Sequence, residues 1–348
     1  MSIPNAGEPS ADVSSPGKKP SWGFAGDFAK YTAAVAIVFF CMNVVRKKLA
    51  HFTWSEVWEG LTTVPAHQIV FALLITAVNF LVLTGYDWIA VRYLKKSLPL
   101  RKIMIGAVIG YALSNLFGWI LGGTSVRYRL YTRWGFNWVE VIAFISVLSV
   151  TFWLGMFLLA GIAFVMLPVN FPERYQDYLY FSPLLYGYAF LACVLAYLLA
   201  TIFIRRPIHI GNQDFAFPPF RLSLVQLTVS AIDFALASLV LYVLLPPGTS
   251  NYSTVLVSYL SAMIVTVVLH VPGGFGVLEL IVLELLEKEG DADTAVPLAI
   301  TCGLLLFRLI YHFIPGLLAI LLFLQQELIW YRSKFTSADD REPESISR

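Results

Sequence analysis

The hydrophobic pattern of the chain is a series of long apolar runs separated by short polar segments. A membrane-spanning helix needs roughly 20 predominantly apolar residues, and about eight stretches of the chain have that character. The predicted spans cover about 26–45, 68–94, 102–121, 139–168, 181–204, 222–245, 253–271 and 294–325. The pattern predicts an all-α polytopic membrane protein. Its transmembrane domain (26–330) would lie between a disordered N-terminal tail (1–25) and a polar C-terminal tail (331–348).

Two of these apolar runs are interrupted by a pair of glycines. The first pair is Gly122-Gly123, and the second is Gly273-Gly274, which follows Pro272 and precedes Gly276. Both pairs read Gly-Gly-x-x-Val, and the second begins 151 positions after the first. Interrupted helices at corresponding points of two halves indicate a binding site in a membrane protein. Non-helical backbone at bilayer depth is tolerated only where protein buries it or a wet cavity lies beside it.

The spacing of the spans also predicts an internal duplication. When the first four spans are shifted by 151 positions, they fall on the last four to within a few residues. We therefore expect two four-helix structural repeats, about 26–168 and 181–325, each with one Gly-Gly broken or re-entrant segment. The sequence leaves open whether the repeats are parallel or inverted. For eight simple crossings, Lys and Arg divide twelve to ten between the two faces, so the positive-inside rule only slightly favours cytoplasmic termini.

Composition agrees with a membrane protein and excludes several other classes. Hydrophobic residues make up 58% of the chain and charged residues 13%, against about 45–50% and about 25% in soluble domains. A net charge of +2 gives no basic surface for nucleic acid. The three scattered cysteines (Cys41, Cys193 and Cys302) form neither a disulfide framework nor a metal motif. The sequence contains no phosphate-binding loop, zinc motif or serine-hydrolase elbow. We therefore expect no cofactor, no metal and no enzymatic activity.

Charged residues follow each glycine pair. Arg127, Arg129 and Arg133 come after the first pair, and on a helix Arg129 and Arg133 share a face. Guanidinium groups bind phosphate oxygens bidentately, whereas Glu279, after the second pair, would bind an amine or balance the arginines. Asn115 gives the run before the first pair a polar position, which interhelical hydrogen bonding explains adequately. The alternative interpretation is an ordinary basic interfacial loop and a solvated acidic helix.

Four further polar residues lie within or beside apolar runs. Asp233 and Arg308 are near the middles of their spans, where a charge costs at least ~2.5–3.5 kcal/mol, so such residues usually pair or line a pathway. Their comparable depth allows them to pair, for a structural or a functional reason. His312 lies one turn after Arg308, and His270 precedes Pro272. A lone histidine is more often a hydrogen-bonded packing residue than a proton-handling group.

The two motifs together resemble one known family. They read Ala112-Leu113-Ser114-Asn115, then Gly122-Gly123 and Val126-Arg127-Tyr128-Arg129-Leu130-Tyr131, and later Val271-Pro272-Gly273-Gly274-Phe275-Gly276-Val277-Leu278-Glu279. Over roughly 26–330 the chain resembles the transmembrane flippase-like domain of lysylphosphatidylglycerol synthetases, which also occurs as stand-alone bacterial inner-membrane proteins. The resemblance implies that Arg127, Arg129 and Glu279 face a lipid pathway. Nothing similar to the soluble aminoacyl-transferase domain follows Trp330, so we do not expect the chain to lysylate lipids by itself.

Three functional hypotheses follow from the sequence. In the first, the protein moves a phospholipid or isoprenoid-linked lipid between leaflets through a polar intramembrane cavity, gated or held by Asp233 and Arg308. In the second, it is an integral-membrane enzyme acting on lipid headgroups, with Glu279 and His270 as acid and base. In the third, it is a membrane subunit for a separately encoded lipid-modifying transferase. We expect a multi-pass protein of the bacterial cytoplasmic (inner) membrane whose partners are membrane lipids; a homo-oligomer is left open.

Overall fold

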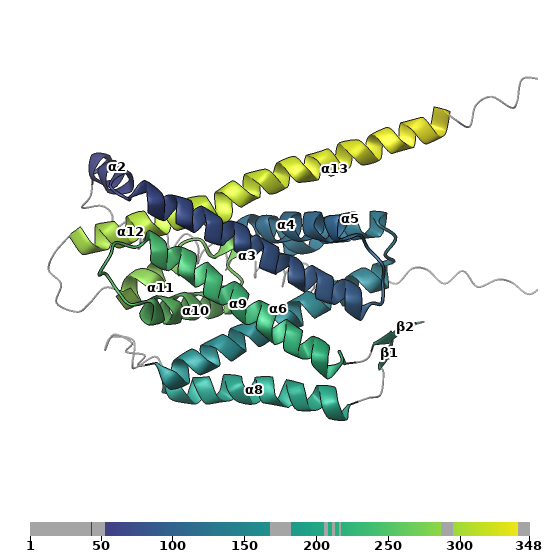
Figure 1. Ribbon diagram of the computed structural model, residues 1–348, viewed down its shortest axis with the longest axis horizontal. Helices are drawn as coiled ribbons and strands as arrows, with labels where there is room; N and C mark the ends of the chain where they lie inside the picture. Colours follow the sequence, from purple (N-terminus) through teal and green to yellow (C-terminus); the bar gives the residue numbers. More distant parts are fainter. Residues whose placement is uncertain are drawn as a thin grey trace, which may run out of the picture.

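The computed structural model describes residues 43, 53–167, 182–204, 208–210, 213–215, 217–286 and 295–339. The expected N-terminal tail and, apart from Asn43, the expected first span lie outside the described residues. The described helices and helical turns are α2 (Trp54–Thr62), α3 (Ala66–Tyr93), α4 (Leu100–Phe117), η1 (Trp119–Thr124), α5 (Ser125–Arg133), α6 (Trp138–Met166), α8 (Pro183–Phe203), α9 (Phe220–Leu244), α10 (Tyr252–Val268), η2 (Pro272–Gly274), α11 (Val277–Leu286), α12 (Ala295–Phe307), η3 (Arg308–Phe313) and α13 (Ile314–Asp339) (Figure 1).

The secondary structure of the described residues is helical apart from one short antiparallel ribbon of β1 (Ile208–Ile210) and β2 (Gln213–Phe215). Six helices of the described part are long and apolar enough to cross a membrane, and α10 is a shorter apolar helix. Their ends lie within a few residues of the predicted spans. The exception is α13, which continues to Asp339 through the expected start of the polar tail.

The helices begin where the local sequence favours a start. Proline directly precedes α3, α4 and α9, and proline is tolerated there because the first N–H groups of a helix have no helical partner. At α6, the Asn137 side chain accepts from the backbone N–H of Glu140 at 2.8 Å, and Glu140 accepts from that of Asn137 at 2.9 Å. This reciprocal cap fixes the first turn of α6. Lys96 also binds Glu140 at 2.8 Å, which holds the α3–α4 loop beside the start of α6.

The chain reverses direction after α4 and forms a helical hairpin with η1 and α5, which we call hairpin 1. The reversal is at Gly118, whose φ of +84° is in the left-handed region that glycine favours. A methyl group at Gly110 would lie 2.8 Å from Nε of Arg127, and one at Gly106 would lie 2.9 Å from the Tyr131 hydroxyl. The returning segment therefore runs antiparallel to α4 and packs against its glycines.

The segments α10, η2 and α11 form a second helical hairpin, which we call hairpin 2. Its tip contains three glycines with positive φ, Gly273 (+62°), Gly274 (+61°) and Gly276 (+82°). In Figure 1, hairpin 1 lies at one end of the long bundle and hairpin 2 at the other. The two hairpins therefore enter the bundle from opposite ends.

The two ends of the bundle differ in charge. We call one the basic end: it carries the loops 94–99 and 134–137 and the start of α9, and the described Lys and Arg residues there are Arg92, Lys95, Lys96, Arg101, Lys102, Arg129, Arg133, Arg221, Arg332 and Lys334. We call the other the α2 end: it carries α2, the loop 245–251 and the end of α11. The described loops and helix ends at the α2 end contain no Lys or Arg.

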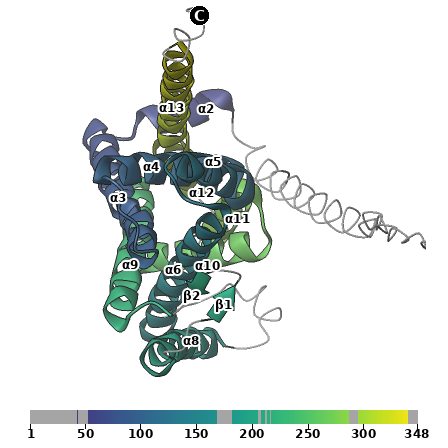
Figure 2. The same ribbon diagram turned by 90° about the vertical axis from the view of Figure 1, so that its right-hand side faces the viewer.

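The apolar core is divided between the same two ends. One large cluster joins the start of α3 with α6, α9, α10, α11, α12 and η3, and a second joins the rest of α3 with α4, α5 and the first half of α6. Helices α3 and α9 run side by side in opposite directions and pack closely along their length, with Gly85 against Val229 (Figure 1). Helix α8 packs mainly on α6 and lies far from hairpin 1 when the bundle is viewed end-on (Figure 2).

Candidate functional site

The tip of hairpin 2 is held by Arg308. Its Nη1 donates to the carbonyl of Gly273 at 2.6 Å, and its Nη2 donates to the carbonyl of Gly274 at 2.7 Å. The same guanidinium binds Glu279 through Nε–Oε1 at 2.5 Å and Nη2–Oε2 at 3.1 Å. Glu279 in turn accepts from the backbone N–H of Gly276 at 2.8 Å. One buried arginine thus satisfies the backbone carbonyls that the glycine turn leaves free.

The position of Arg308 depends on a local change of helix type. It begins η3, a π-helical turn between α12 and α13, and π-helical turns often occur at functional sites. Pro315 follows directly, and proline lacks the N–H that a regular α-helix would offer to the carbonyl of Tyr311. Nη1 of Arg308 also donates to Nε2 of His312 at 3.2 Å. The predicted shared face of these two residues is therefore confirmed, and His312 is buried with it.

Hairpin 1 is held to α3 by a second buried ion pair. Arg127 and Asp87 are both fully buried, and their side chains are 3.3 Å apart. The Tyr131 hydroxyl donates to the other oxygen of Asp87 at 2.6 Å. Asp87, near the end of α3, is therefore the anion that compensates Arg127. Arg127 was expected to face a lipid pathway; in this structure its side chain is fully buried and faces protein groups.

Arg127 lies among aromatic rings. Its guanidinium carbon is 4.2 Å from the centroid of the Tyr111 ring and 5.7 Å from that of Trp119. These distances are within the range of cation–π attraction. Its Nε and Nη1 have no hydrogen-bond partner among the described residues. The side chain is therefore oriented by an ion pair and by ring faces.

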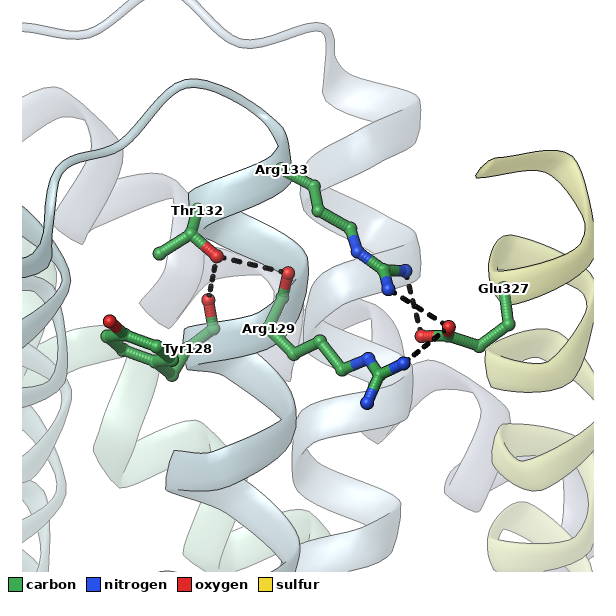
Figure 3. A network of polar contacts seen from close by, with 5 residues as sticks. All are labelled: Tyr128, Arg129, Thr132, Arg133 and Glu327. Atoms are coloured by element: carbon green, nitrogen blue, oxygen red, sulfur yellow. Dashed lines mark hydrogen bonds and ion pairs between the residues drawn. The ribbon is translucent and has the colours of Figure 1, made fainter. Parts of the chain in front are cut away.

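The other two arginines of hairpin 1 bind one glutamate of α13. Arg133 binds Glu327 bidentately at 2.8 and 3.0 Å, and Arg129 binds it at 2.7 Å (Figure 3). Arg133 also lies over the Trp330 ring, 4.2 Å from its centroid. The predicted common face of Arg129 and Arg133 is confirmed, but their partner here is a protein carboxylate. Arg129 stays 54% exposed and so retains donors that face outward.

Asp233 is on the face of α9 that packs against α3. It accepts from the Tyr86 hydroxyl at 2.8 Å and from Nδ2 of Asn79 at 3.1 Å. Nδ2 of Asn79 also donates to the Tyr311 hydroxyl at 2.6 Å. The predicted Asp233–Arg308 pair is therefore wrong, because Arg308 binds Glu279 and Asp233 binds neutral groups. A similar position along their spans does not bring the two side chains together, because each side chain faces a different set of partners.

The two hairpin tips meet in the middle of the bundle. A methyl group at Gly273 would lie 2.9 Å from the backbone oxygen of Asn115, the third-last residue of α4. One at Gly316 of α13 would lie 2.9 Å from Cγ of Leu116. Asn115 thus contributes to the contact through its backbone, and α13 passes both tips.

The first glycine pair is not the point of reversal that the sequence predicted. Gly122 and Gly123 lie inside the π-helical turn η1, four and five residues after the reversal at Gly118. A methyl group at Gly122 would clash with the carbonyl of Leu113, and one at Gly123 would clash with the Ser114 hydroxyl. These glycines allow η1 to pack closely on α4. At the second pair the backbone is non-helical, with Pro272 opening the turn.

His270 lies apart from these clusters. It has an unusual positive φ of +55°, its ring is exposed, and Nδ1 is 3.0 Å from the carbonyl oxygen of Val268. Glu279 is bonded to Arg308 and to Gly276, so the acid–base pair of Glu279 and His270 is not assembled here. Among the described residues, no group of three or more His, Cys, Asp or Glu side chains could hold a metal ion.

Two hollows lie at the α2 end. One, of about 240 Å³, is lined by Gln68 and by residues of the α9–α10 loop, and one of about 270 Å³ lies between that loop and Leu285–Leu286. Neither is lined by the residues of the ion pairs. The charged side chains expected to line a cavity are packed on one another and on backbone carbonyls in this structure.

Several site residues were missed by sequence reasoning. They are Asn79, Tyr86, Asp87, Tyr131, Tyr311 and Glu327, each of which bonds either a residue that the sequence singled out or another member of this set. Asp87 and Asn79 carried a usable signal, because a polar side chain inside an apolar span needs a partner. The tyrosines carried none, because tyrosine is common at many depths of a membrane protein.

Comparisons with known proteins support a membrane protein with bacterial relatives. No family model matches the chain. The uncharacterized protein slr0712 of Synechocystis is 33% identical over 294 residues, which cover 81% of this chain and 87% of the relative. The inner membrane protein YbhN of Escherichia coli is 30% identical over 310 residues, which cover 88% of this chain and 94% of the relative.

The chain is also similar, at lower identity, to the membrane region of phosphatidylglycerol lysyltransferase. The protein of that name from Staphylococcus haemolyticus is 25% identical over 298 residues, which cover 84% of this chain but 33% of the longer relative. The resemblance found in the glycine motifs therefore extends along most of the chain. On the nearly full-length match to its Escherichia coli relative, the chain belongs to the family of the inner membrane protein YbhN.

Proposed function

We propose that the protein moves a phospholipid or an isoprenoid-linked lipid between the leaflets, with the headgroup passing between the tips of hairpins 1 and 2. One observation carries the proposal: two glycine-rich tips enter from opposite ends and meet beside buried ionised side chains. Such side chains in membrane proteins usually mark substrate or ion pathways. The similarity to the membrane region of a phosphatidylglycerol lysyltransferase supports a lipid as the substrate.

The bonds of Arg308 suggest how a headgroup would be received. A guanidinium has donors that match phosphate oxygens bidentately, and those of Arg308 are engaged by Glu279 and by the carbonyls of Gly273 and Gly274. A lipid phosphate that replaced Glu279 would keep Arg308 compensated and would release the start of α11. Opening of the tips would then be coupled to binding, because the same guanidinium serves both.

The arginines of hairpin 1 would act before this step. Arg129 and Arg133 lie at the basic end near Trp330, an aromatic residue typical of the membrane interface. Both are bound by a single carboxylate, so the cluster keeps a net positive charge that would attract an anionic headgroup. We propose that Arg129 and Arg133 capture the headgroup, and that Arg127 holds hairpin 1 in place.

We further propose that the two halves are inverted repeats. The first repeat would contain α3, hairpin 1 and α6, and the second α9, hairpin 2 and α12–α13. Shifted by 151 positions, the end of α3 falls on the end of α9 (residue 244), and the end of α4 falls on the end of α10 (residue 268). Two observations support inversion: α3 and α9 pack in opposite directions, and the two hairpins enter the bundle from opposite ends. Discontinuous helices at such a repeat interface are typical of transporters.

The test is leaflet transfer by the purified full-length chain in vesicles of phosphatidylethanolamine and phosphatidylglycerol. A trace of phosphatidylglycerol carries a label on its acyl chain. Dithionite added outside the vesicles bleaches the label in the exposed outer leaflet and so reports which leaflet the lipid occupies. We expect the labelled lipid in the inner leaflet to become accessible faster than in protein-free vesicles. The proposal would fail if neither this lipid nor an isoprenoid phosphate were transferred faster than in protein-free vesicles.

A further inference from the structure

Asp233 is a buried carboxylate whose bonding partners, among the described residues, are all neutral. It is 7% exposed and accepts from Tyr86 and from Asn79. The nearby buried arginines have other anions: Arg127 binds Asp87, and Arg308 binds Glu279. An ionised carboxylate inside a membrane is costly unless a cation compensates it. This site therefore differs from the two ion pairs beside it.

The elements packed against α9 bring mainly tyrosines to Asp233. Besides Tyr86 on α3, the titratable and charged groups that face this region are Tyr111 on α4, Tyr259 on α10, and Tyr311, Arg308 and His312 in η3. Helices α8 and α12 contain no charged residue, and Glu140, the charged residue of α6, is in its first turn at the basic end. The surroundings of Asp233 are thus polar but supply no dedicated counter-ion.

These surroundings can hold Asp233 in either charge state. The Tyr86 hydroxyl donates to an ionised carboxylate and can accept from a protonated one, since a phenol is both donor and acceptor. Nδ2 of Asn79 can donate to the second oxygen in both states. Side-chain carboxyls of this kind form proton relays in membrane pumps and transporters.

Asp233 is also connected to the elements that hold both hairpins. The Tyr86 ring packs on the Tyr111 ring, with the two centroids 5.5 Å apart. The guanidinium carbon of Arg127 lies 4.2 Å from the centroid of the same Tyr111 ring. On the other side, Asn79 bonds Tyr311, which is in the same π-helical turn as Arg308. A change of charge at Asp233 would therefore alter hydrogen bonds next to both tips.

We propose that Asp233 carries the proton that drives lipid transfer. This inference rests on the proposed function and names its energy source. Water at one face supplies a proton to the Asp233 carboxylate, and the protonated carboxyl releases it to water at the other face after the headgroup has moved. One proton moving with one singly charged phosphate headgroup carries no net charge, so the step is independent of the membrane potential.

The test uses the vesicles of the transfer assay with the outer medium one pH unit more acidic than the lumen and the potential clamped by potassium and valinomycin. With one proton per lipid, the labelled phosphatidylglycerol should approach an inner-to-outer ratio of about tenfold, because one pH unit is a tenfold ratio of proton activity. Asp233→Asn should transfer lipid to an even distribution and fail to accumulate it. Asp233→Glu keeps a titratable group and should still accumulate lipid.

The outcomes separate this inference from the proposed function. If the wild-type chain transfers no lipid, the proposed function fails and the proton role fails with it. If it transfers lipid rapidly but only to an even distribution under the pH difference, the protein is a passive facilitator and the proton role is overturned. Accumulation by Asp233→Asn equal to that of the wild-type chain would also overturn it. Folding of each variant is checked by its elution profile and unfolding temperature in detergent.

Discussion

Arg308 and Glu279 form a two-point ion pair, Nε–Oε1 at 2.5 Å and Nη2–Oε2 at 3.1 Å, that ties the π-helical turn η3 to the start of α11. The same arginine binds two carbonyls of the glycine turn. The pair therefore has two separable effects. It compensates a buried charge, and it fixes the tip of hairpin 2.

Removal of one partner of this pair should strongly destabilise the protein. We expect Arg308→Met to lower the free energy of unfolding by about 3–5 kcal/mol, because Glu279, whose side chain is only 16% exposed, would be left without a cation. The double variant Arg308→Met/Glu279→Gln should lose much less than the sum of the single variants. The measurement is thermal unfolding of the purified variants in detergent. Additive losses in this double-mutant cycle would show that the two side chains do not interact.

The Arg127–Asp87 pair of hairpin 1 should behave in the same way. Because both side chains are fully buried, we expect Asp87→Asn and Arg127→Met each to cost about 3–5 kcal/mol, and the double variant to recover part of that loss. Arg127→Lys should not substitute for arginine, since an ammonium lacks the planar group that packs between Tyr111 and Gly110. Full stability of Arg127→Lys in the same unfolding measurement would contradict this packing.

Gly273 should be sensitive to alanine for a reason beyond backbone strain. An alanine in the left-handed region costs about 1–2 kcal/mol, and Gly248, with a φ of +86° and open space around it, measures that cost alone. At Gly273 the added methyl would also lie 2.6 Å from the Phe275 ring and 2.9 Å from the Asn115 carbonyl. We therefore expect Gly273→Ala to reduce stability and lipid transfer more than Gly248→Ala does. Equal effects would mean that the tips are not in close contact.

The charge difference between the two ends predicts the orientation of the protein. The basic end should face the cytoplasm, because lysine and arginine concentrate in cytoplasmic loops. In a background without the native cysteines, Thr249→Cys should react with a membrane-impermeant maleimide on intact cells, and Ser97→Cys only after permeabilisation. The reverse pattern would invert the orientation. Labelling of both from one side would contradict the entry of the hairpins from opposite ends.

The sequence predicts the helices well because the length of an apolar run is a local property. The bounds of α3, α9 and α10 differ from the predicted spans by at most a few residues. The sides of the membrane were less predictable, because α4 and α10 are long enough to be read as crossings although their chains turn back. Reading each of them as a simple crossing assigns basic residues to both faces, which gives the nearly even division of charge. The hairpins proposed above would place the described basic residues at the basic end.

The partners of the charged residues depend on tertiary packing and could not be read from spacing. Asp87 and Arg127 are 40 positions apart, and Arg133 and Glu327 are 194 apart. The predicted Asp233–Arg308 pair relied on equal depth, but equal depth does not place two side chains on facing surfaces. The i,i+4 relationship of Arg308 and His312 was predictable, because one helix fixes that geometry.

The central claim is that a headgroup passes where the hairpin tips meet, so the tips must separate during transfer. A disulfide between Leu116→Cys and Gly316→Cys, in a background without Cys41, Cys193 and Cys302, would tie hairpin 1 to the helix that follows Arg308. A methyl group at position 316 would lie 2.9 Å from Cγ of Leu116, which places the two side chains within disulfide reach. We expect leaflet transfer to stop on oxidation and to return on reduction. Undiminished transfer by the fully cross-linked protein would contradict the claim.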